Sequence, residues 1–396
     1  MPVLGSNKDT MKLENRRQIL GLIHRRPISR ASLAKQTKLT QSAIGNIVGD
    51  LLETGIIQET QIAPEESAPG RKPILLDLVP SWKTLVGISI DREGFEVGLL
   101  DLRGKILGQT ITLPYQDNPQ TALDSIAKQA EKLLKEQGIP SQQVLGVGAI
   151  VPGPVNASQG IILNPPRFDS WHGLPLEKEL SRRLSYPVFV EHNASAMARA
   201  ELDLGSPYNS FALLIINDGI GLGLALDGKI YTGANGLGCE LGHTSIDFQG
   251  RPCSCGNRGC LELYASTSAI LYDARRSRPE LTSWKQLVDN AWNGDPYCNA
   301  MLDLQGEYLA SSVINLNNLL ELEAILLSGA AAYRGELLLE KLQRQVQQRV
   351  LSKNTRSLAF QLSRSKDHPP VTAAGAVLLH QLFHGQLFAV EFGKMP

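Results

Sequence analysis

The chain contains the segment His243-Thr-Ser-Ile-Asp-Phe-Gln-Gly-Arg-Pro-Cys253-Ser-Cys255-Gly-Asn-Arg-Gly-Cys260-Leu-Glu262. Three of the five cysteines in the chain fall within it, together with one histidine. One imidazole and three thiolates complete the tetrahedral ligand set that structural zinc prefers. Three unrelated apolar cysteines beside a structural histidine are the alternative, but apolar packing gives no reason to gather them among glycines and a proline. The segment therefore predicts a Zn²⁺ site formed by His243, Cys253, Cys255 and Cys260.

Two strings that overlap this segment point to a family. They are Gly236-Leu-Gly238-Cys-Glu240-Leu-Gly242-His243 and Cys255-Gly-Asn-Arg-Gly-Cys260-Leu-Glu262. Together they closely resemble the signature of the ROK family of repressors and sugar kinases, and the resemblance covers nearly the whole chain. It includes an N-terminal extension of the repressor branch, so the chain is most similar to sugar-responsive regulators of the Mlc, NagC and XylR type. The resemblance implies an α/β fold in which an N-terminal winged helix-turn-helix precedes a two-lobed, actin-like ROK domain of the sugar-kinase type.

Length, composition and charge limit the class of protein. A chain of 396 residues is long enough for two or three compact units. Because it has no run of about 18 uncharged apolar residues, we expect no membrane span. The cysteines, mostly clustered as metal ligands, favour a reducing compartment, and we expect a cytoplasmic protein. Residues 1–80 carry a net charge of +3 in a chain whose net charge is zero, which is consistent with a nucleic-acid-binding head.

The pattern of residues 1–80 is typical of a small DNA-binding unit. Apolar residues repeat at helical spacing in 14–25, and Ser29 is placed to cap a short second helix. Thr40 is placed to cap a third helix, Gln41 to Thr54, which Gly55 would end. Two candidate strands, 56–60 and 73–79, enclose a polar loop. Three helices with a tight turn between the second and third, followed by a wing, predict a winged helix-turn-helix over residues 1–80.

The predicted DNA contacts lie on the third helix and on the wing. Side chains facing the major groove would be those of Gln41, Ser42, Gly45 and Asn46. In the wing, Arg71 and Lys72 would contact phosphate or the minor groove. The third helix carries no Lys or Arg, so affinity would come from the wing and from Arg16, Arg17, Arg30, Lys35 and Lys38. We therefore expect a homodimer or a dimer of dimers on double-stranded operator DNA. A small helical dimerisation unit is the alternative.

From about residue 85 the pattern changes to alternating strands and helices. Strands are predicted at 86–90, 95–100, 143–151 and 211–216, a helix is predicted at 121–137, and Gly219-x-Gly221-x-Gly223 is predicted to form a glycine-rich turn. We expect residues 81–396 to form a ROK sugar-binding domain. Lobe 1 would span about 81–195 together with a C-terminal helix in 371–396, and lobe 2 would span about 196–370 and carry the zinc site.

Comparison with the kinases of the family argues against phosphoryl transfer. Where those kinases have Asp-x-Gly-Gly-Thr, this chain has Ser89-Ile-Asp91-Arg-Glu93, with carboxylates where triphosphate oxygens would lie. Where they have Glu-Asn-Asp-Ala, this chain has Glu191-His192-Asn193-Ala194, which places Asn193 at the catalytic-base position. An amide cannot accept the proton of a sugar hydroxyl near neutral pH. We therefore expect no enzyme and no catalytic residue.

The same resemblance implies that the sugar-binding positions are better preserved than the catalytic ones. It places six residues at hydroxyl-binding positions, with altered chemistry at the second and third: Gly153, His192, Asn193, Glu240, His243 and Glu262. One ring nitrogen of His243 would bind zinc and the other would face the ligand. The loop Asn164-Pro-Pro-Arg-Phe-Asp-Ser-Trp171 offers an aromatic side chain to the cleft, although its two prolines also explain it as a loop of fixed shape.

These observations lead to one hypothesis and two alternatives. The hypothesis is a DNA-binding transcriptional regulator, a repressor of sugar uptake or catabolism genes, whose degenerate kinase cleft binds a sugar or sugar-phosphate effector. One alternative is an ATP-dependent hexose kinase with a DNA-binding head. The other is a regulator controlled by a sugar-transport protein partner.

Overall fold

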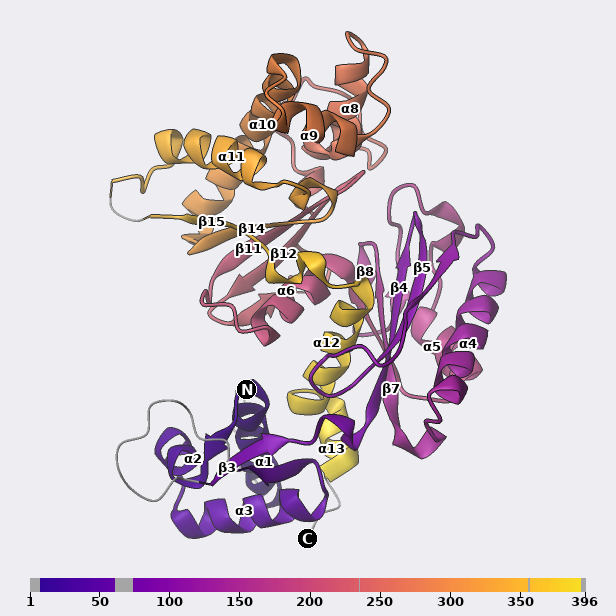
Figure 1. Ribbon diagram of the computed structural model, residues 1–396, viewed down its shortest axis with the longest axis vertical. Helices are drawn as coiled ribbons and strands as arrows, with labels where there is room; N and C mark the ends of the chain where they lie inside the picture. Colours follow the sequence, from indigo (N-terminus) through magenta and orange to yellow (C-terminus); the bar gives the residue numbers. More distant parts are fainter. Residues whose placement is uncertain (1–7, 61–73, 235, 355–356, 393–396) are drawn as a thin grey trace.

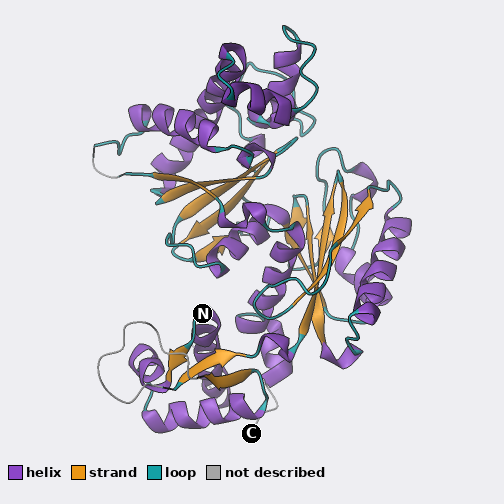
Figure 2. Cartoon of the chain, in the orientation of Figure 1, coloured by secondary structure: helices purple, strands orange, loops and turns teal. Residues whose placement is uncertain are grey.

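The computed structural model describes residues 8–60, 74–234, 236–354 and 357–392, and it confirms the expected α/β class. Three units follow one another along the chain (Figure 1). The first is a small helical head with a three-stranded sheet, and the other two are lobes that are each built on a five-stranded sheet. Figure 2 shows helices against the faces of both large sheets. Among the described residues no single helix has the length and apolarity needed to cross a membrane. Only the pair α12 (Pro370–Phe383) and α13 (Gln386–Phe392), bent by 58°, passes that test when taken together.

The head has the helix-turn-helix that the sequence predicts. Its elements are α1 (Lys8–Arg25), β1 (Ile28–Ser29), α2 (Arg30–Thr37), α3 (Gln41–Glu53), β2 (Ile57–Thr60) and β3 (Leu75–Leu78). Ser29 Oγ accepts a hydrogen bond from the Ser32 amide, and Thr40 Oγ1 accepts one from the Ala43 amide, so both predicted caps are present. The short strand β1 was not expected, and it pairs with β3 to give the order β1-β3-β2. The predicted wing residues Arg71 and Lys72 lie outside the described residues.

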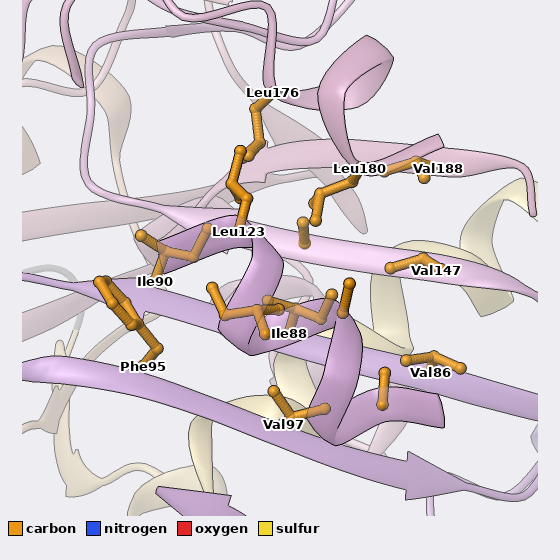
Figure 3. Packing of buried hydrophobic residues seen from close by; sticks show 14 of the residues in the cluster. Val86, Ile88, Ile90, Phe95, Val97, Leu123, Val147, Leu176, Leu180 and Val188 are labelled. Carbon is orange, nitrogen blue, oxygen red and sulfur yellow. The ribbon is translucent and has the colours of Figure 1, made fainter. Parts of the chain in front are cut away.

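Lobe 1 is a mixed sheet in the order β10-β7-β4-β5-β6. The strands are β4 (Thr84–Asp91), β5 (Gly94–Leu100), β6 (Ile111–Pro114), β7 (Val144–Val151) and β10 (Val188–His192). Helices α4 (Pro119–Glu136) and α5 (Leu176–Leu184) contribute to the core on one face. Figure 3 shows β4 and β7 presenting Val86, Ile88 and Val147 to Leu123 and Leu180. Every residue of β7 is buried, which explains its continuous apolar sequence.

Lobe 2 is a mixed sheet in the order β13-β12-β11-β14-β15. The strands are β11 (Phe211–Ile216), β12 (Ile220–Leu226), β13 (Lys229–Tyr231), β14 (Ala324–Ser328) and β15 (Ala359–Leu362). Helix α6 (Asn193–Asp203) packs on one face, and α10 (Pro296–Leu320) and α11 (Glu336–Arg349) pack on the other. The short helices α7 (Glu262–Ala265), α8 (Thr267–Arg275) and α9 (Trp284–Trp292) connect the metal-ligand segment to α10.

The glycine-rich segment after β11 differs from its prediction as a turn. Gly221 and Gly223 lie within strand β12, and only Gly219 lies in the connection between β11 and β12. A Cβ atom on Gly223 would lie 2.2 Å from the carbonyl oxygen of Ala194 and 2.6 Å from the Cβ of Ala198, both in α6. Because α6 lies directly on this strand, glycine is required there for close helix–sheet packing.

Helix α12 (Pro370–Phe383) joins the three units. It packs on lobe 1 and on α6, and its C-terminal end continues into α13 (Gln386–Phe392) beside the head (Figure 1). Leu378 and Phe388 share one core with Ile19 and Leu20 of α1. The ring of His24 stacks on Phe383 with centroids 4.2 Å apart. The sequence predicted the return of this helix to lobe 1, but it did not predict that the head would share its core.

The contact between α6 and β12 generates a stability prediction. We expect Gly223→Ala to lower the free energy of unfolding by about 1–3 kcal/mol, since the added methyl group must displace the backbone of α6. Gly49→Ala is the matched control, because a Cβ at this helical position has no neighbour within 4 Å. We expect this control to be neutral or to stabilise by up to about 1 kcal/mol. Urea unfolding of both variants would measure the difference, and equal midpoints would contradict the packing argument.

Candidate ligand cleft and metal centre

A cavity of ≈ 310 Å³ lies between the two lobes. It is lined from lobe 1, from the start of α6 and from lobe 2. All six residues that the sequence predicts to bind a sugar line this one cavity: Gly153, His192, Asn193, Glu240, His243 and Glu262. The structure therefore brings together residues that are more than 100 positions apart in the chain. Their contact with a sugar stays a prediction.

Strand ends position the lobe 1 side of the cavity. His192 ends β10 and Asn193 begins α6, while Gly153 follows the end of the neighbouring parallel strand β7. The carboxyl ends of parallel strands meet at one edge of a sheet, where ligands commonly bind. A Cβ on Gly153 would lie 2.7 Å from Glu240 Oε1 and 2.9 Å from His192 Cδ2. Glycine at this position therefore lets the two side chains converge.

Burial and neighbouring charges alter the ionisation of the cavity. Burial raises the pKa of Glu240 to about 7, and the nearby Glu262 carboxylate adds to the effect. Burial lowers the pKa of His192 to about 4, and the Arg92 guanidinium acts in the same direction. His192 is therefore a neutral imidazole at pH 7 and can both donate and accept hydrogen bonds. These two groups present mixed donors and acceptors, which suits hydroxyl groups.

Asn193, at the position of the kinase base, lies close to the carboxylate of Asp91, at the end of β4. Burial raises the pKa of Asp91. That effect outweighs the opposing effects of the Arg92 amide, which donates to Asp91 Oδ1 at 2.6 Å, and of the Asn193 side chain. Asp91 and Glu93 both line the cavity, as the comparison with kinases predicted.

Two arginines in the cleft were missed by the sequence reasoning. Arg92 Nε and Nη2 donate to the carbonyl oxygen of Pro166 at 3.1 and 2.7 Å. Arg167 Nη2 donates to the carbonyl oxygen of Asp218 at 3.2 Å, which links a loop of lobe 1 to lobe 2. Two features of the sequence could have indicated them. Arg92 lies in the segment where the family kinases have glycines, and Arg167 lies in the 164–171 loop.

The aromatic side chain of that loop does not line the cleft. Trp171 is fully buried in the core of lobe 1. Its ring stacks on Phe168 with centroids 5.1 Å apart and also contacts Phe95. The loop is therefore anchored by its aromatics, and Pro166 and Arg167 are its residues that line the cavity.

The four predicted metal ligands come together in lobe 2. One donor atom from each of His243, Cys253, Cys255 and Cys260 lies within 4.8 Å of the others. Antiparallel bridges between Ser245 and Cys260 and between Pro252 and Arg258 fold the segment back on itself. Cys253 Sγ lies 3.7 Å from His243 Nδ1, and Cys255 Sγ lies 3.7 Å from Cys260 Sγ. This is the donor set and compactness that a tetrahedral metal ion requires.

The metal cluster and the cleft have a common wall. His243 and Glu262 line the cavity, and Glu262 Oε1 lies 3.7 Å from His243 Nδ1 and 3.9 Å from Cys253 Sγ. Burial raises the pKa of the Cys260 thiol to about 12, and the neighbouring thiols add to the effect. Three thiolates this close together would repel one another, and a bound cation would compensate their charge. The donors therefore fit a metal ion that would also hold one wall of the cleft.

The head exposes the predicted face of α3. The side chains of Gln41, Ser42 and Asn46 and the backbone of Gly45 are all exposed on this helix. Arg30 forms an ion pair with Glu59 at 2.7 Å. Their proposed DNA contacts stay predictions.

One expected phosphate contact is wrong. Arg16 is only 2% exposed and forms an ion pair with Asp50 of α3, so it holds the helices of the head together. Arg17 also has a partner within the protein, because its guanidinium lies 5.3 Å from the ring centroid of Phe388. Lys35 and Lys38 remain exposed and available to phosphate.

Comparisons with known proteins agree on one family. The sequence model described as the ROK family matches residues 85–381. A xylose repressor of Caldicellulosiruptor bescii is 27% identical over 371 residues, which cover 90% of this chain and 92% of that protein. A glucokinase of Thermotoga maritima is 31% identical over 278 residues, which cover 66% of this chain and 86% of the kinase. A crystal structure of a ROK family transcriptional regulator, a homologue of the E. coli Mlc protein, matches with a TM-score of 0.81 and 27% identity, covering 96% of this chain and 98% of that one.

Proposed function

Because the chain belongs to the ROK family, we propose that it is a transcriptional repressor that binds operator DNA through its head and a sugar through the cleft between its lobes. The observation that carries the proposal is a helix-turn-helix with an exposed polar face on α3, joined to a lobed body whose six sugar-binding positions share one cavity. The similarity to the xylose repressor runs over 90% of this chain, whereas the glucokinase covers 66%. We assign the head to residues 1–80 and the ROK domain to 81–396.

We propose that the protein has no kinase activity. The base position holds Asn193, whose amide cannot accept the proton of a sugar hydroxyl near neutral pH. The carboxylates of Asp91 and Glu93 line the space toward which a triphosphate would extend. Like charges in a sheltered cleft repel strongly, because little water screens them. The kinase fold would thus serve as a sugar sensor.

We propose that the metal is Zn²⁺ and that its role is structural. All four donors come from the protein, so no ligand position is left open, as is typical of structural zinc. When bound, the ion would neutralise three thiolates and fix the ring of His243 through one nitrogen. His243 would then offer its other nitrogen to the cleft. Thiolates of this kind persist in a reducing compartment, which supports a cytoplasmic location.

We propose that the DNA-binding form is a homodimer. The exposed face of α3 carries no cationic side chain, so one head alone would bind weakly. Two heads on one operator raise the affinity through effective concentration. The effector would be a sugar or a sugar phosphate that acts by favouring one lobe arrangement over another. No described contact favours a sugar-transport protein as the signal, and that partner stays an alternative.

The metal assignment predicts about one zinc atom per chain in protein purified without added zinc. We expect Cys253→Ser to lose the metal, because the tetrahedral set is then incomplete. Cys298→Ser is the matched control, since Cys298 is a buried thiol of α10 outside the cluster. Metal analysis by mass spectrometry would measure both. Full zinc occupancy in Cys253→Ser would show that the ligand set is wrong.

The DNA assignment predicts base-specific effects on α3. We expect Gln41→Ala or Asn46→Ala to weaken binding to the preferred site by about 1–3 kcal/mol and to change which base pairs are preferred. Gln142→Ala is the matched control, because this glutamine is exposed on lobe 1, far from α3 in the sequence. Gel-shift titration on sites selected from random DNA would measure the change. Unaltered affinity and base preference in both α3 variants would refute the assignment.

The loss of the base predicts that no hexose is phosphorylated at a useful rate. Removal of a general base alone typically lowers a rate by about two to four orders of magnitude. A coupled assay with ATP, Mg²⁺ and a panel of hexoses would measure turnover, with the Thermotoga maritima glucokinase as positive control. Turnover comparable to that of the control would restore the kinase alternative.

A further inference from the structure

A second cavity opens from the sugar cleft. It has a volume of ≈ 540 Å³ and shares Pro166, Arg167, Glu240 and His243 with the first cavity. One side is the lobe 1 loop that contains His172, and the other side is the metal-ligand segment at Ser254 and Cys255. The two cavities therefore adjoin each other at these four residues.

The lining of the second cavity is polar and carries both donors and acceptors. Asn164, Asp169 and His172 face it from lobe 1, and Ser254 faces it from lobe 2. The His172 Nε2 atom lies 2.9 Å from the carbonyl oxygen of Pro165 and 3.7 Å from Asp169 Oδ1. Amide, carboxylate, imidazole and hydroxyl groups at one place suit a ligand that presents many hydroxyl groups.

Both sides of this cavity are held firmly. The lobe 1 loop is anchored by Trp171, which is fully buried next to Phe168. Ser254 stands between Cys253 and Cys255, two members of the metal cluster. Side chains on supported segments lose little freedom when a ligand binds, which favours affinity.

The charge of the inner cavity disfavours a phosphate group. Five acidic residues line it, Asp91, Glu93, Asp218, Glu240 and Glu262, against two guanidinium groups. Burial raises the pKa of Asp91, Glu93 and Glu240, so these three acids carry less negative charge than they would in water. Both guanidinium groups, of Arg92 and Arg167, already donate to backbone carbonyls. An ester dianion would meet a net negative wall in a sheltered space. An uncharged ring meets only hydrogen-bonding partners.

We propose that the effector is an uncharged disaccharide. One ring would lie in the inner cavity and the second ring between His172 and Ser254. The first cavity, of ≈ 310 Å³, is at the lower end of ligand sites, which typically span roughly 300–1,000 Å³. The adjoining cavity of ≈ 540 Å³ adds room for a second ring. This inference rests on the proposed function, and it names the ligand class of that same cleft.

Calorimetric titration of the full-length, zinc-loaded protein tests the proposal. The probes are glucose, xylose and glucose 6-phosphate, together with the disaccharides cellobiose, maltose and xylobiose. We expect at least one disaccharide to bind at least tenfold more tightly than its own monosaccharide, and glucose 6-phosphate to bind no more tightly than glucose. The same disaccharide should release selected operator DNA in a gel-shift assay.

Two variants locate the second ring. We expect His172→Ala and Ser254→Ala each to reduce the preference for the disaccharide over its monosaccharide by about tenfold, while zinc content stays unchanged. Ser170→Ala is the matched control, because Ser170 is exposed in the same loop but lines neither cavity. We expect this control to keep the full preference.

The outcomes separate the inference from the proposed function. If a monosaccharide releases the operator and binds as tightly as every disaccharide, the inference is wrong and the repressor function stands. If His172→Ala and Ser254→Ala both keep the full preference, the second ring does not lie in this cavity and the inference is again wrong. If no sugar of either kind binds, the proposed function fails and the inference fails with it.

Discussion

The burial of α12 is the interaction on which the rest of the structure depends. Nearly all of its residues from Val371 to Phe383 are buried, and the helix carries no Asp, Glu, Lys or Arg. A helix that is apolar on all sides must be covered on all sides. Here lobe 1, α6 and the head share that task, and α13 extends the shared core to Phe392. Separating any of these parts would expose apolar surface to water, which costs about 25 cal/mol per Å².

This arrangement gives the cleft a physical connection to the head. Helix α6 begins at Asn193 in the cavity and packs along α12, whose far end meets α1 through Phe383 and His24. Arg103 of lobe 1 adds a hydrogen bond to the carbonyl oxygen of His24 at 2.6 Å and an ion pair with Asp77 of β3. A ligand that binds one lobe arrangement more tightly than another shifts the population toward it. Helix α12 is thus the packed element that lies between the cavity-lining start of α6 and the head.

The metal centre and the cleft depend on each other for a similar reason. His243 belongs to both, and the carboxylate of Glu262 is within 4 Å of two members of the metal cluster. Two isolated antiparallel bridges, Ser245 with Cys260 and Pro252 with Arg258, make the segment compact and hold these donor atoms close together. The same segment projects Ser254 toward the mouth of the cleft. The four metal-type donors and one wall of the cavity are therefore built from one folded loop.

The sequence by itself determined those features that arise from residues close together in the chain or from the chemistry of a single side chain. The caps at Ser29 and Thr40, the buried strand β7, the amide at Asn193 and the compact His–Cys set all follow from local pattern or from the family signature. Only the tertiary structure decided that Arg16 is buried against Asp50, that Gly223 lies under α6, that Arg92 donates to the carbonyl oxygen of Pro166, and that Arg167 links lobe 1 to lobe 2. Each of these features is a contact between segments far apart in the chain. A side chain's charge or size does not reveal such a partner, because the partner is chosen by how the lobes and the head pack together.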